Sequence, residues 1–189
     1  MKLNLQNKVA LVTGGSRGIG AATVRAFAAA GAQVVFNYQR ARSQAEQLAA
    51  ECGPDRCVPV ACDLTGTDTA ASLVQAAVQR FGRLDILVVN HGVWPPEDVA
   101  VDRMSPDQWR NTVAVNLDSV FALLKHTVAQ IKSQAAPGPI AGHIVLVSST
   151  SGQRGEAFHC DYSATKGALI SMTKTLSTEL APHRIHVNC

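Results

Sequence analysis

Near its N-terminus the chain reads Lys8-Val9-Ala10-Leu11-Val12-Thr13-Gly14-Gly15-Ser16-Arg17-Gly18-Ile19-Gly20. A short apolar run that ends in glycines is typical of a strand buried on both faces. Gly14, Gly18 and Gly20 follow it where a helix opens, and the free N–H groups of a helix N-terminus attract phosphate. Because the spacing differs from the Gly-x-Gly-x-x-Gly dinucleotide fingerprint, structural glycines and a phosphate-binding turn are equal alternatives on this motif alone.

Outward from this turn, strand and helix patterns alternate along the whole chain. Short apolar runs predict strands at residues 8–13, 33–37, 57–61, 84–89, 143–148 and 184–188. Helices are predicted at 18–30, at 43–51, along the apolar stripe from Ala70 to Phe81, and at 161–180. From Ser105 to about Gln134 two helices are predicted, which meet near Val115-Asn116. Strands joined through helices form parallel sheets with right-handed crossovers. The predicted fold is therefore one α/β domain over residues 1–189, a doubly wound parallel sheet in three layers, with its ligand crevice at the carboxyl ends of the strands.

Local patterns add three sharper expectations. The apolar stripe of helix 18–30 is predicted to pack on the sheet through Ile19, Thr23, Ala26, Phe27 and Ala30. Ser105 can cap the helix that follows it, and Gln108 can complete a capping box by reaching back. Pro59 interrupts strand 57–61, which predicts an outer position for that strand in the sheet.

Composition excludes several classes of protein. The 189 residues carry a net charge of +3 without a Lys/Arg run, which argues against a nucleic-acid partner. There is no apolar run near the roughly 20 residues needed to cross a bilayer, and the polar start does not resemble a signal peptide. Five cysteines, an odd number, favour free thiols in a reducing cytoplasm. Cys52, Cys57 and Cys62 are evenly spaced, but without a Cys-x-x-Cys or a matched histidine pair they predict thiols and no metal site.

In dinucleotide-binding sheets the adenosine ribose lies at the end of the second strand, and an acidic residue there binds the 2′-hydroxyl of NAD. Asn37 occupies this position, so no carboxylate would repel a 2′-phosphate. Arg17 and Arg40 could pair with one, which favours NADP(H) over NAD(H); the alternative is that both are solvated surface cations. Asp63 follows the third strand, where it can bind adenine or act as a turn or capping residue.

A second group of polar residues lies near the other end of the chain. Tyr162 and Lys166 are four apart on one predicted helix and therefore share a face. A cation beside a phenol favours the phenolate, which suits a phenol to general acid–base work. Ser149 follows the fifth strand and could hold a substrate carbonyl at the same crevice.

Taken together, these features resemble the short-chain dehydrogenase/reductase family over residues 4–189, with a pattern most similar to 3-oxoacyl-[acyl-carrier-protein] reductases and glucose dehydrogenases. The motifs are Thr13–Gly20, Asp63-Leu64, Val89-Asn90-His91-Gly92, Asn116, Ser148-Ser149 and Tyr162-Ser163-Ala164-Thr165-Lys166. The resemblance implies a Rossmann fold and a nicotinamide cofactor.

The resemblance also implies a role for each matching residue. Tyr162 would be the catalytic acid/base, Lys166 would hold the nicotinamide ribose, and Ser149 would orient the carbonyl. Asn116 would anchor a water that relays protons. The cofactor would further contact Gly14, Ser16, Arg17, Gly18, Ile19, Gly20, Asn37, Arg40, Asp63, Leu64, Asn90 and Gly92.

Two departures from the family pattern stand out. His91 replaces the alanine of Asn-Asn-Ala-Gly, and it is interpreted as tolerated variation, with a catalytic role as the alternative. After Cys189 the family continues with a Pro-Gly turn, a substrate-covering helical segment and a last strand. The chain is therefore expected to be incomplete at this end and to leave Ile185 and Val187 on an exposed edge. With a complete C-terminus it is expected to form a homo-oligomer.

The sequence thus predicts a cytoplasmic oxidoreductase that transfers a hydride between NADP(H) and a ketone or secondary alcohol. From the resemblance, a 3-oxoacyl thioester is the first expectation for the substrate and a sugar or polyol the second. The segment 153–160 is expected to line the substrate mouth, or to be only a connecting loop. The alternative function is a nucleotide-binding module with little or no turnover.

Overall fold

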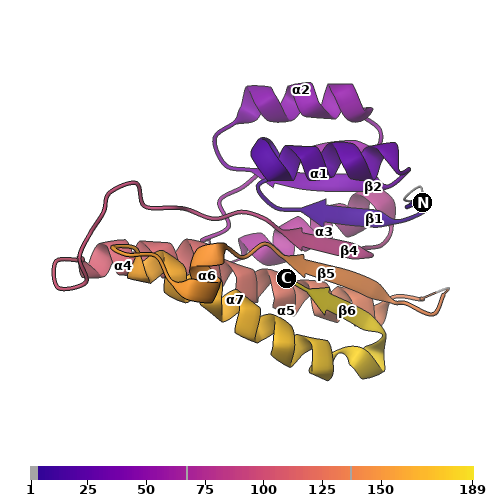
Figure 1. Cartoon of the computed structure of the whole chain (residues 1–189). Coiled ribbons are helices and arrows are strands. Elements are labelled where there is room, and N and C mark those ends of the chain that lie inside the picture. The colour runs from indigo at the N-terminus through magenta and orange to yellow at the C-terminus, as the bar shows by residue number, and fades with distance from the viewer. Residues whose placement is uncertain (1–3, 67, 137) are drawn as a thin grey trace.

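The computed structural model describes residues 4–66, 68–136 and 138–189 and contains one six-stranded parallel sheet with the order β3-β2-β1-β4-β5-β6 (Figure 1). The strands are β1 (Val9–Val12), β2 (Gln33–Tyr38), β3 (Cys57–Ala61), β4 (Ile86–Val89), β5 (Gly142–Leu146) and β6 (Ile185–Asn188). The helices are α1 (Gly18–Ala29), α2 (Arg42–Cys52), α3 (Thr69–Phe81), α4 (Pro106–Val113), the π-helical turn η1 (Ala114–Asp118), α5 (Ser119–Ser133), α6 (Thr150–Arg154), α7 (Cys160–Glu179) and the 3-10 turn η2 (Ala181–His183).

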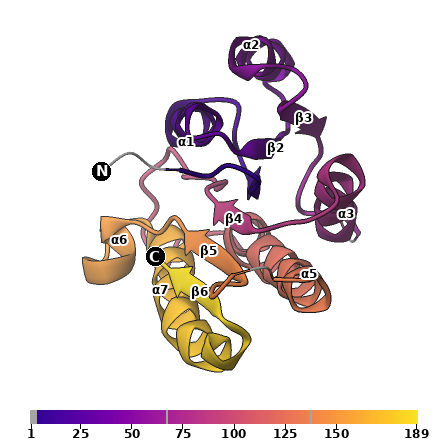
Figure 2. The same ribbon diagram turned by 90° about the vertical axis from the view of Figure 1, so that its right-hand side faces the viewer.

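The two faces of the sheet carry different helices, because successive strand residues point to opposite sides. On β1, Ala10 and Val12 pack under α1 and α2, whereas Leu11 packs with α3, α5 and α7. Figure 2 shows α1 and α2 on one side of the sheet and α3, α5 and α7 on the other. The predicted doubly wound α/β fold is confirmed, and β3 with its Pro59 lies at an edge as expected.

The predicted stripe of α1 is wrong. The buried residues are Gly20, Ala21, Val24 and Ala28, whereas Ile19 is 66% exposed. The start of α1 lies so close to the glycine turn that a Cβ on Gly20 would overlap the carbonyl oxygen of Gly14. Only small residues fit against this turn, so Ile19 points outward, whereas Val24 and Phe27 farther along α1 still pack on the core.

The region predicted as two helices is continuous. Its N-terminus is capped as expected, since the Ser105 hydroxyl accepts from the Gln108 N–H at 3.1 Å. The Gln108 side chain does not complete the capping box, because it donates instead to Asp161 at the start of α7. Near Asn116 the helix does not break; it widens into η1 and continues as α5.

Two short helices, α6 and η2, were not predicted, and α6 takes up the first part of the expected loop. Strand β6 lies at an edge of the sheet as expected, but its two apolar side chains are covered. Ile185 and Val187 are 1% and 6% exposed because they join the core with α5 and α7, and it is His186 and Asn188 that face outward.

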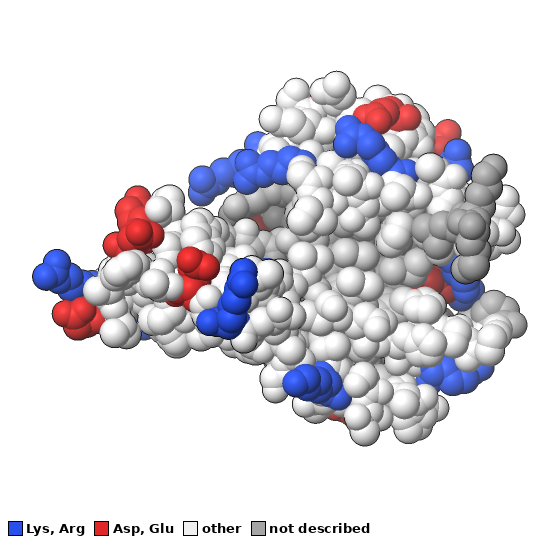
Figure 3. All heavy atoms as spheres, viewed as in Figure 1, with Lys and Arg blue, Asp and Glu red and all other residues white. Residues whose placement is uncertain are grey.

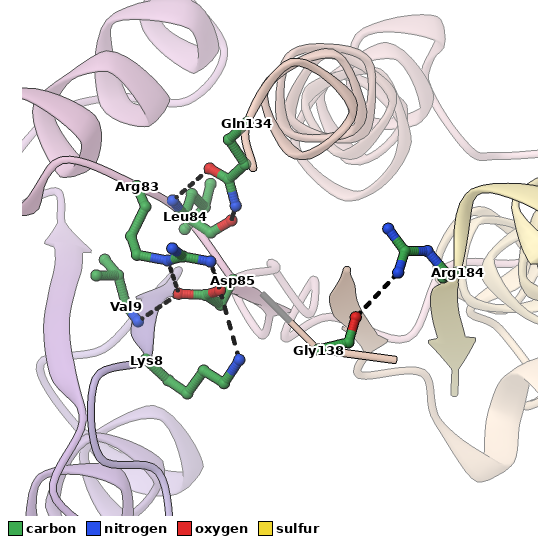
Figure 4. A network of polar contacts seen from close by, with 8 residues as sticks. All are labelled: Lys8, Val9, Arg83, Leu84, Asp85, Gln134, Gly138 and Arg184. Carbon is green, nitrogen blue, oxygen red and sulfur yellow. Dashed lines mark hydrogen bonds and ion pairs between the residues drawn. The ribbon is translucent and has the colours of Figure 1, made fainter. Parts of the chain in front are cut away.

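A polar clamp holds the amino ends of the strands, opposite the predicted crevice (Figure 4). The buried Asp85 carboxylate accepts from the Val9 N–H at 2.9 Å and binds Arg83 through two hydrogen bonds of 2.9 and 2.8 Å. Gln134 pairs through its amide with both backbone groups of Leu84. The strands are thus fastened at one end, which leaves their carboxyl ends free to form a site.

Candidate functional site

A groove of about 780 Å³ lies at the carboxyl ends of β1, β2, β3 and β4. Figure 3 shows a hollow on this side of the molecule with Lys and Arg side chains on its rim. The groove brings together nine of the residues predicted to bind a cofactor: Gly14, Ser16, Arg17, Asn37, Arg40, Asp63, Leu64, Asn90 and Gly92. Gly18, Ile19 and Gly20 form the first turn of α1, directly after Arg17.

The start of α1 has the features of an anion site. Arg17 is the N-cap, no described side chain caps the helix, and its first turn carries no acidic residue. Gly18 has φ +54°, and the place that a Cβ would take is open to 4 Å. The N–H groups of this turn are therefore accessible to a pyrophosphate, and the helix dipole favours one there.

Two amides, the buried Asn37 and the half-buried Asn90, shape the glycine turn. The Asn37 Oδ1 accepts from the Gly14 N–H at 2.8 Å, and its Nδ2 donates to the Cys62 carbonyl at 3.2 Å. The Asn90 Nδ2 donates to the carbonyls of Thr13 and Gly14, both at 3.1 Å. Asn37 thus lines the groove, but both ends of its amide are used to join the turn to the end of β3.

The rim of the groove carries the residues expected to select the cofactor. Arg17 and Arg40 are exposed, and neither forms an ion pair with a described residue. Asp63 accepts from the N–H and hydroxyl of Thr65 and from Gln39. The backbone hydrogen bond from Thr65 is the main cause that lowers the pKa of Asp63. Asp63 therefore has the geometry of a turn residue, which was the alternative to a residue that binds adenine.

His91 links the glycine turn to η1 and α5. Its Nε2 lies 2.7 Å from the Ser119 Oγ, and that hydroxyl donates to the Val115 carbonyl at 2.7 Å. The Ser119 oxygen must therefore accept from an Nε2–H, which leaves Nδ1, 2.8 Å from the Thr13 Oγ1, as an acceptor. Burial, with a smaller effect from the charge of Lys166, lowers the pKa of His91 to about 4, so the ring is neutral near pH 7.

The inner end of the groove meets the predicted catalytic residues at Gly92. A Cβ on Gly92 would lie 3.1 Å from the Asn116 Oδ1 and 3.4 Å from the Lys166 Nζ. Lys166 is 4% exposed, its Nζ donates to the Val147 carbonyl at 2.9 Å, and burial lowers its pKa. The Asn116 amide binds both the N–H and the carbonyl of Val93, so its side chain holds the segment after β4.

Tyr162 and Ser149 complete the predicted set. The Lys166 Nζ lies 5.8 Å from the centre of the Tyr162 ring. Ser149 is the N-cap of α6 and accepts from the Ser151 N–H at 3.2 Å. Helix α6 packs closely on α7, since a Cβ on Gly152 would come within 2.6 Å of the Lys166 carbonyl carbon. Asn116 of η1 and Lys166 of α7 therefore meet the groove at Gly92, whereas Tyr162 on α7 and Ser149 at the start of α6 do not line it.

Sequence reasoning missed Trp94 and Asp161 beside Tyr162, and it named His159 only as part of the segment 153–160 expected to line the substrate mouth. Trp94 stacks on His159 with ring centroids 3.9 Å apart and meets the Tyr162 ring edge-on at 4.6 Å. Asp161 is fully buried and accepts from Thr112 and from the Tyr162 N–H, both at 2.8 Å. The one available signal for Trp94 was its position before two prolines, two residues after Gly92.

Other kinds of site find no support within residues 4–66, 68–136 and 138–189. There, no three His, Cys, Asp or Glu residues are grouped so that they could hold a metal ion. No helix of that part of the chain has the length and apolar character to cross a bilayer. The five cysteines, all described, are free thiols.

The groove at the switch point of a doubly wound sheet has a lysine beside its inner end and a tyrosine one helical turn before that lysine, an arrangement that fits one family. Residues 8–189 fit the family model described as short chain dehydrogenase. The chain belongs to this family of oxidoreductases, which bind a nicotinamide cofactor.

The relatives carry different names. Momilactone A synthase from Oryza sativa subsp. japonica is 38% identical over 98% of this chain, and a 3-oxoacyl-[acyl-carrier-protein] reductase from Synechocystis is 34% identical over 97%. L-fucose dehydrogenase from Mus musculus is 37% identical over 96%. The chain spans 65%, 72% and 63% of these proteins, respectively.

Solved structures agree with this family. A 3-ketoacyl-(acyl-carrier-protein) reductase from Brucella melitensis, complexed with NADH, superposes with a TM-score of 0.88 at 35% identity. The match covers 96% of this chain and 74% of that one.

Proposed function

We propose that this chain transfers a hydride between NADP(H) and a ketone or secondary alcohol. The observation that carries the proposal is the position of Gly92, which lines the groove and also lies against Lys166 and Asn116. One continuous site can therefore hold a dinucleotide along the groove and present its reactive end to Tyr162.

The residues of the groove fit a dinucleotide. The uncapped start of α1 would hold the pyrophosphate, and Gly18 leaves room for it. Arg17 and Arg40 would pair with a ribose 2′-phosphate, since guanidinium groups match phosphate geometry. Leu64 and Asp63 would border the adenine. When bound, the nicotinamide supplies or accepts the hydride.

The remaining chemistry is the movement of one proton, which we assign to Tyr162. In reduction its hydroxyl would protonate the substrate oxygen, and in oxidation it would take the proton back. Ser149 would orient that oxygen. Lys166, held by Val147 and close to the Tyr162 ring, would stabilise the phenolate and bind the nicotinamide ribose. Asn116 would hold the backbone of Val93, and with it the segment after β4, in place beside the site.

The proton transfer is tested with Tyr162→Phe and Lys166→Met. We expect Tyr162→Phe to lower the rate of NADPH oxidation with a ketone at least about 100-fold while NADPH still binds. Lys166→Met should lower both the rate and the affinity for NADPH. Lys174→Met, an exposed lysine on the same helix, is the matched control. Absorbance at the NADPH band measures turnover, and NADPH fluorescence measures binding. Unchanged turnover in Tyr162→Phe would refute the mechanism.

The same assays separate the alternative function. The Asn116 and Ser149 side chains are occupied by Val93 and Ser151, which favours a module that binds the nucleotide without turnover. Binding of NADPH with no oxidation in the unmodified chain, over a panel of ketones, would select this alternative.

The cofactor preference has its own test. We expect Arg17→Ala and Arg40→Ala each to weaken NADPH binding about tenfold and to leave NADH binding within about twofold, because only NADPH carries the 2′-phosphate. Isothermal titration measures both. Equal losses for the two cofactors would favour NAD(H), the choice that the NADH-bound Brucella melitensis reductase illustrates.

We also propose that the protein self-associates and works in the cytoplasm. An apolar groove of about 400 Å³ runs between α5 and α7, and Phe121 on its wall is 61% exposed. Exposed apolar surface of this kind suits a second copy.

The free cysteines fit a reducing compartment.

A further inference from the structure

An aromatic wall stands directly beside Tyr162. Trp94, from the segment after β4, stacks on His159 at an interplanar angle of 15° and meets the Tyr162 ring at 79°. Although these contacts cover part of the indole, Trp94 remains 47% exposed. A large apolar ring is therefore accessible next to the phenol that we assign to proton transfer.

The wall is held rigidly. His159 is 3% exposed, and its two ring nitrogens lie 3.0 Å from the Pro95 carbonyl and 3.1 Å from the Ala157 carbonyl. The His159 ring therefore ties the chain next to Trp94 to the chain before α7. Pro95 and Pro96 further restrict the backbone that carries the indole. Trp94 is thus prepared for contact before any ligand arrives, which lowers the entropy lost on binding.

One of the three non-glycine residues with positive φ in the described part of the chain lies at the same place. Phe158, the residue before His159, has φ +67° and is 54% exposed. Its carbonyl accepts from the Val99 N–H at 3.2 Å, a second tie between the two segments. A bulky residue in this conformation is strained, and such strain persists only where the surroundings impose it, commonly at ligand sites.

The charges on these two segments are mostly acidic. Glu97, Asp98 and Glu156 are exposed, and Arg154 is the one basic residue of 93–100 and 154–160. A substrate that carries phosphates, such as a coenzyme A thioester, would meet like charge here. An uncharged substrate would not.

From these observations we propose that the substrate is an uncharged, ring-bearing alcohol or ketone, whose ring packs on Trp94 while its carbinol or carbonyl oxygen reaches Tyr162. Trp94 is then the residue that determines specificity, and His159 is the positioning residue behind it. The proposal rests on the proposed function, and it replaces the 3-oxoacyl thioester with a carbocycle or sugar ring as the expected class.

The binding test uses the fact that the chain contains two tryptophans, Trp94 and Trp109. In a Trp109→Phe variant the remaining tryptophan fluorescence comes from Trp94. Titration with cyclohexanol and with 2-hexanol compares a ring with an open chain of equal carbon number. We expect saturable fluorescence changes with a midpoint for cyclohexanol about 3- to 10-fold lower. Equal midpoints, or no saturable change with either alcohol, would overturn the proposal.

The kinetic test compares cyclohexanone, 2-hexanone and acetoacetyl-coenzyme A with NADPH. We expect kcat/KM to be highest for cyclohexanone. Trp94→Ala should lower it about tenfold through KM and change it little for 2-hexanone, while Trp94→Phe should retain most of it. Trp109→Ala is the matched control. A preference for the thioester, or equal losses on both ketones, would overturn the proposal. Absence of turnover with every ketone defeats the proposed function instead, and the fluorescence comparison then still decides the ring preference.

Discussion

At the scale of single residues, His91 shows how a polar side chain can serve as a fixed connector. Its ring accepts from Thr13 and donates to Ser119, so it joins the glycine turn to α5 only in the neutral form. Protonation would turn the acceptor nitrogen into a donor toward the Thr13 hydroxyl and would place a charge near Lys166. The interpretation as tolerated variation therefore understates the structural role of this residue.

This linkage predicts a loss of stability in mild acid. The His91 pKa is about 4 in the folded protein against 6.5 as its ordinary value. Between these values the unfolded chain binds more protons, so stability falls as pH drops, and the drop from pH 7 to pH 5 should cost about 2 kcal/mol through this group. Urea unfolding of His91→Ala should lack this part of the pH dependence, whereas the control His183→Ala, an exposed histidine, should keep it. The same pH dependence in His91→Ala and the parent chain would contradict the assignment.

At the scale of elements, the π-helical turn η1 is the feature that organises the inner end of the groove. A π turn adds one residue to the helical ladder and such turns are frequent at functional sites. Within η1, Val115 accepts from Ser119, and Asn116 reaches both backbone groups of Val93. One local widening of a helix thus supports both the His91 link and the segment that carries Trp94.

Removal of the Asn116 amide should therefore loosen two backbone groups at once. We expect Asn116→Ala to lower the free energy of unfolding by about 1 to 3 kcal/mol, because the Val93 N–H and carbonyl lose their partners. Chemical denaturation measures the loss. Asn111→Ala, on the exposed side of α4, should have a much smaller effect, and similar values for the two variants would count against this role.

The elements also show where prediction from sequence succeeds. The strands could be placed because buried parallel strands are short apolar runs, and Pro59 correctly marked an edge. The burial of α1 was misjudged because small residues face the glycine turn, a contact between backbone segments that periodicity does not record. The π turn depends on packing against α7 and on the hydrogen bonds of Asn116 to Val93, so the sequence marked only a junction near Val115-Asn116 and not its geometry.

The candidate site divides in the same way. The motifs located the groove, Tyr162 and Lys166, since each motif follows a strand or lies on one helix face. The internal use of Asn37 could not be foreseen, because it depends on the position of the Cys62 carbonyl directly after the neighbouring strand β3. The pairing of Trp94 with His159 joins segments far apart in the chain and has no local pattern.

At the scale of the whole molecule, the two ends of the sheet have separate tasks. The polar clamp around Asp85 fastens the amino ends, and the groove occupies the carboxyl ends (Figures 3 and 4). Stability and ligand binding should therefore respond to different substitutions.

Asp85→Asn tests this separation. It removes the charge that Arg83 binds, and we expect a loss of about 2 to 4 kcal/mol in the free energy of unfolding, because Asp85 is buried and its partner would be left without it. The affinity for NADPH should stay within about twofold at temperatures where the variant is folded. Arg25→Ala, which breaks an exposed ion pair with Glu51, should destabilise far less. A fall in NADPH affinity that matches the fall in stability would contradict the separation.

The two asparagines behind the glycine turn have a consequence for which substitutions the pocket tolerates. Because Asn37 and Asn90 maintain the shape of the turn through inward contacts, the side chains of Arg17 and Arg40 are not needed to hold that shape. We therefore expect exchange of these two cations to leave the pocket folded, whereas substitution of either amide should disturb the shape of the turn.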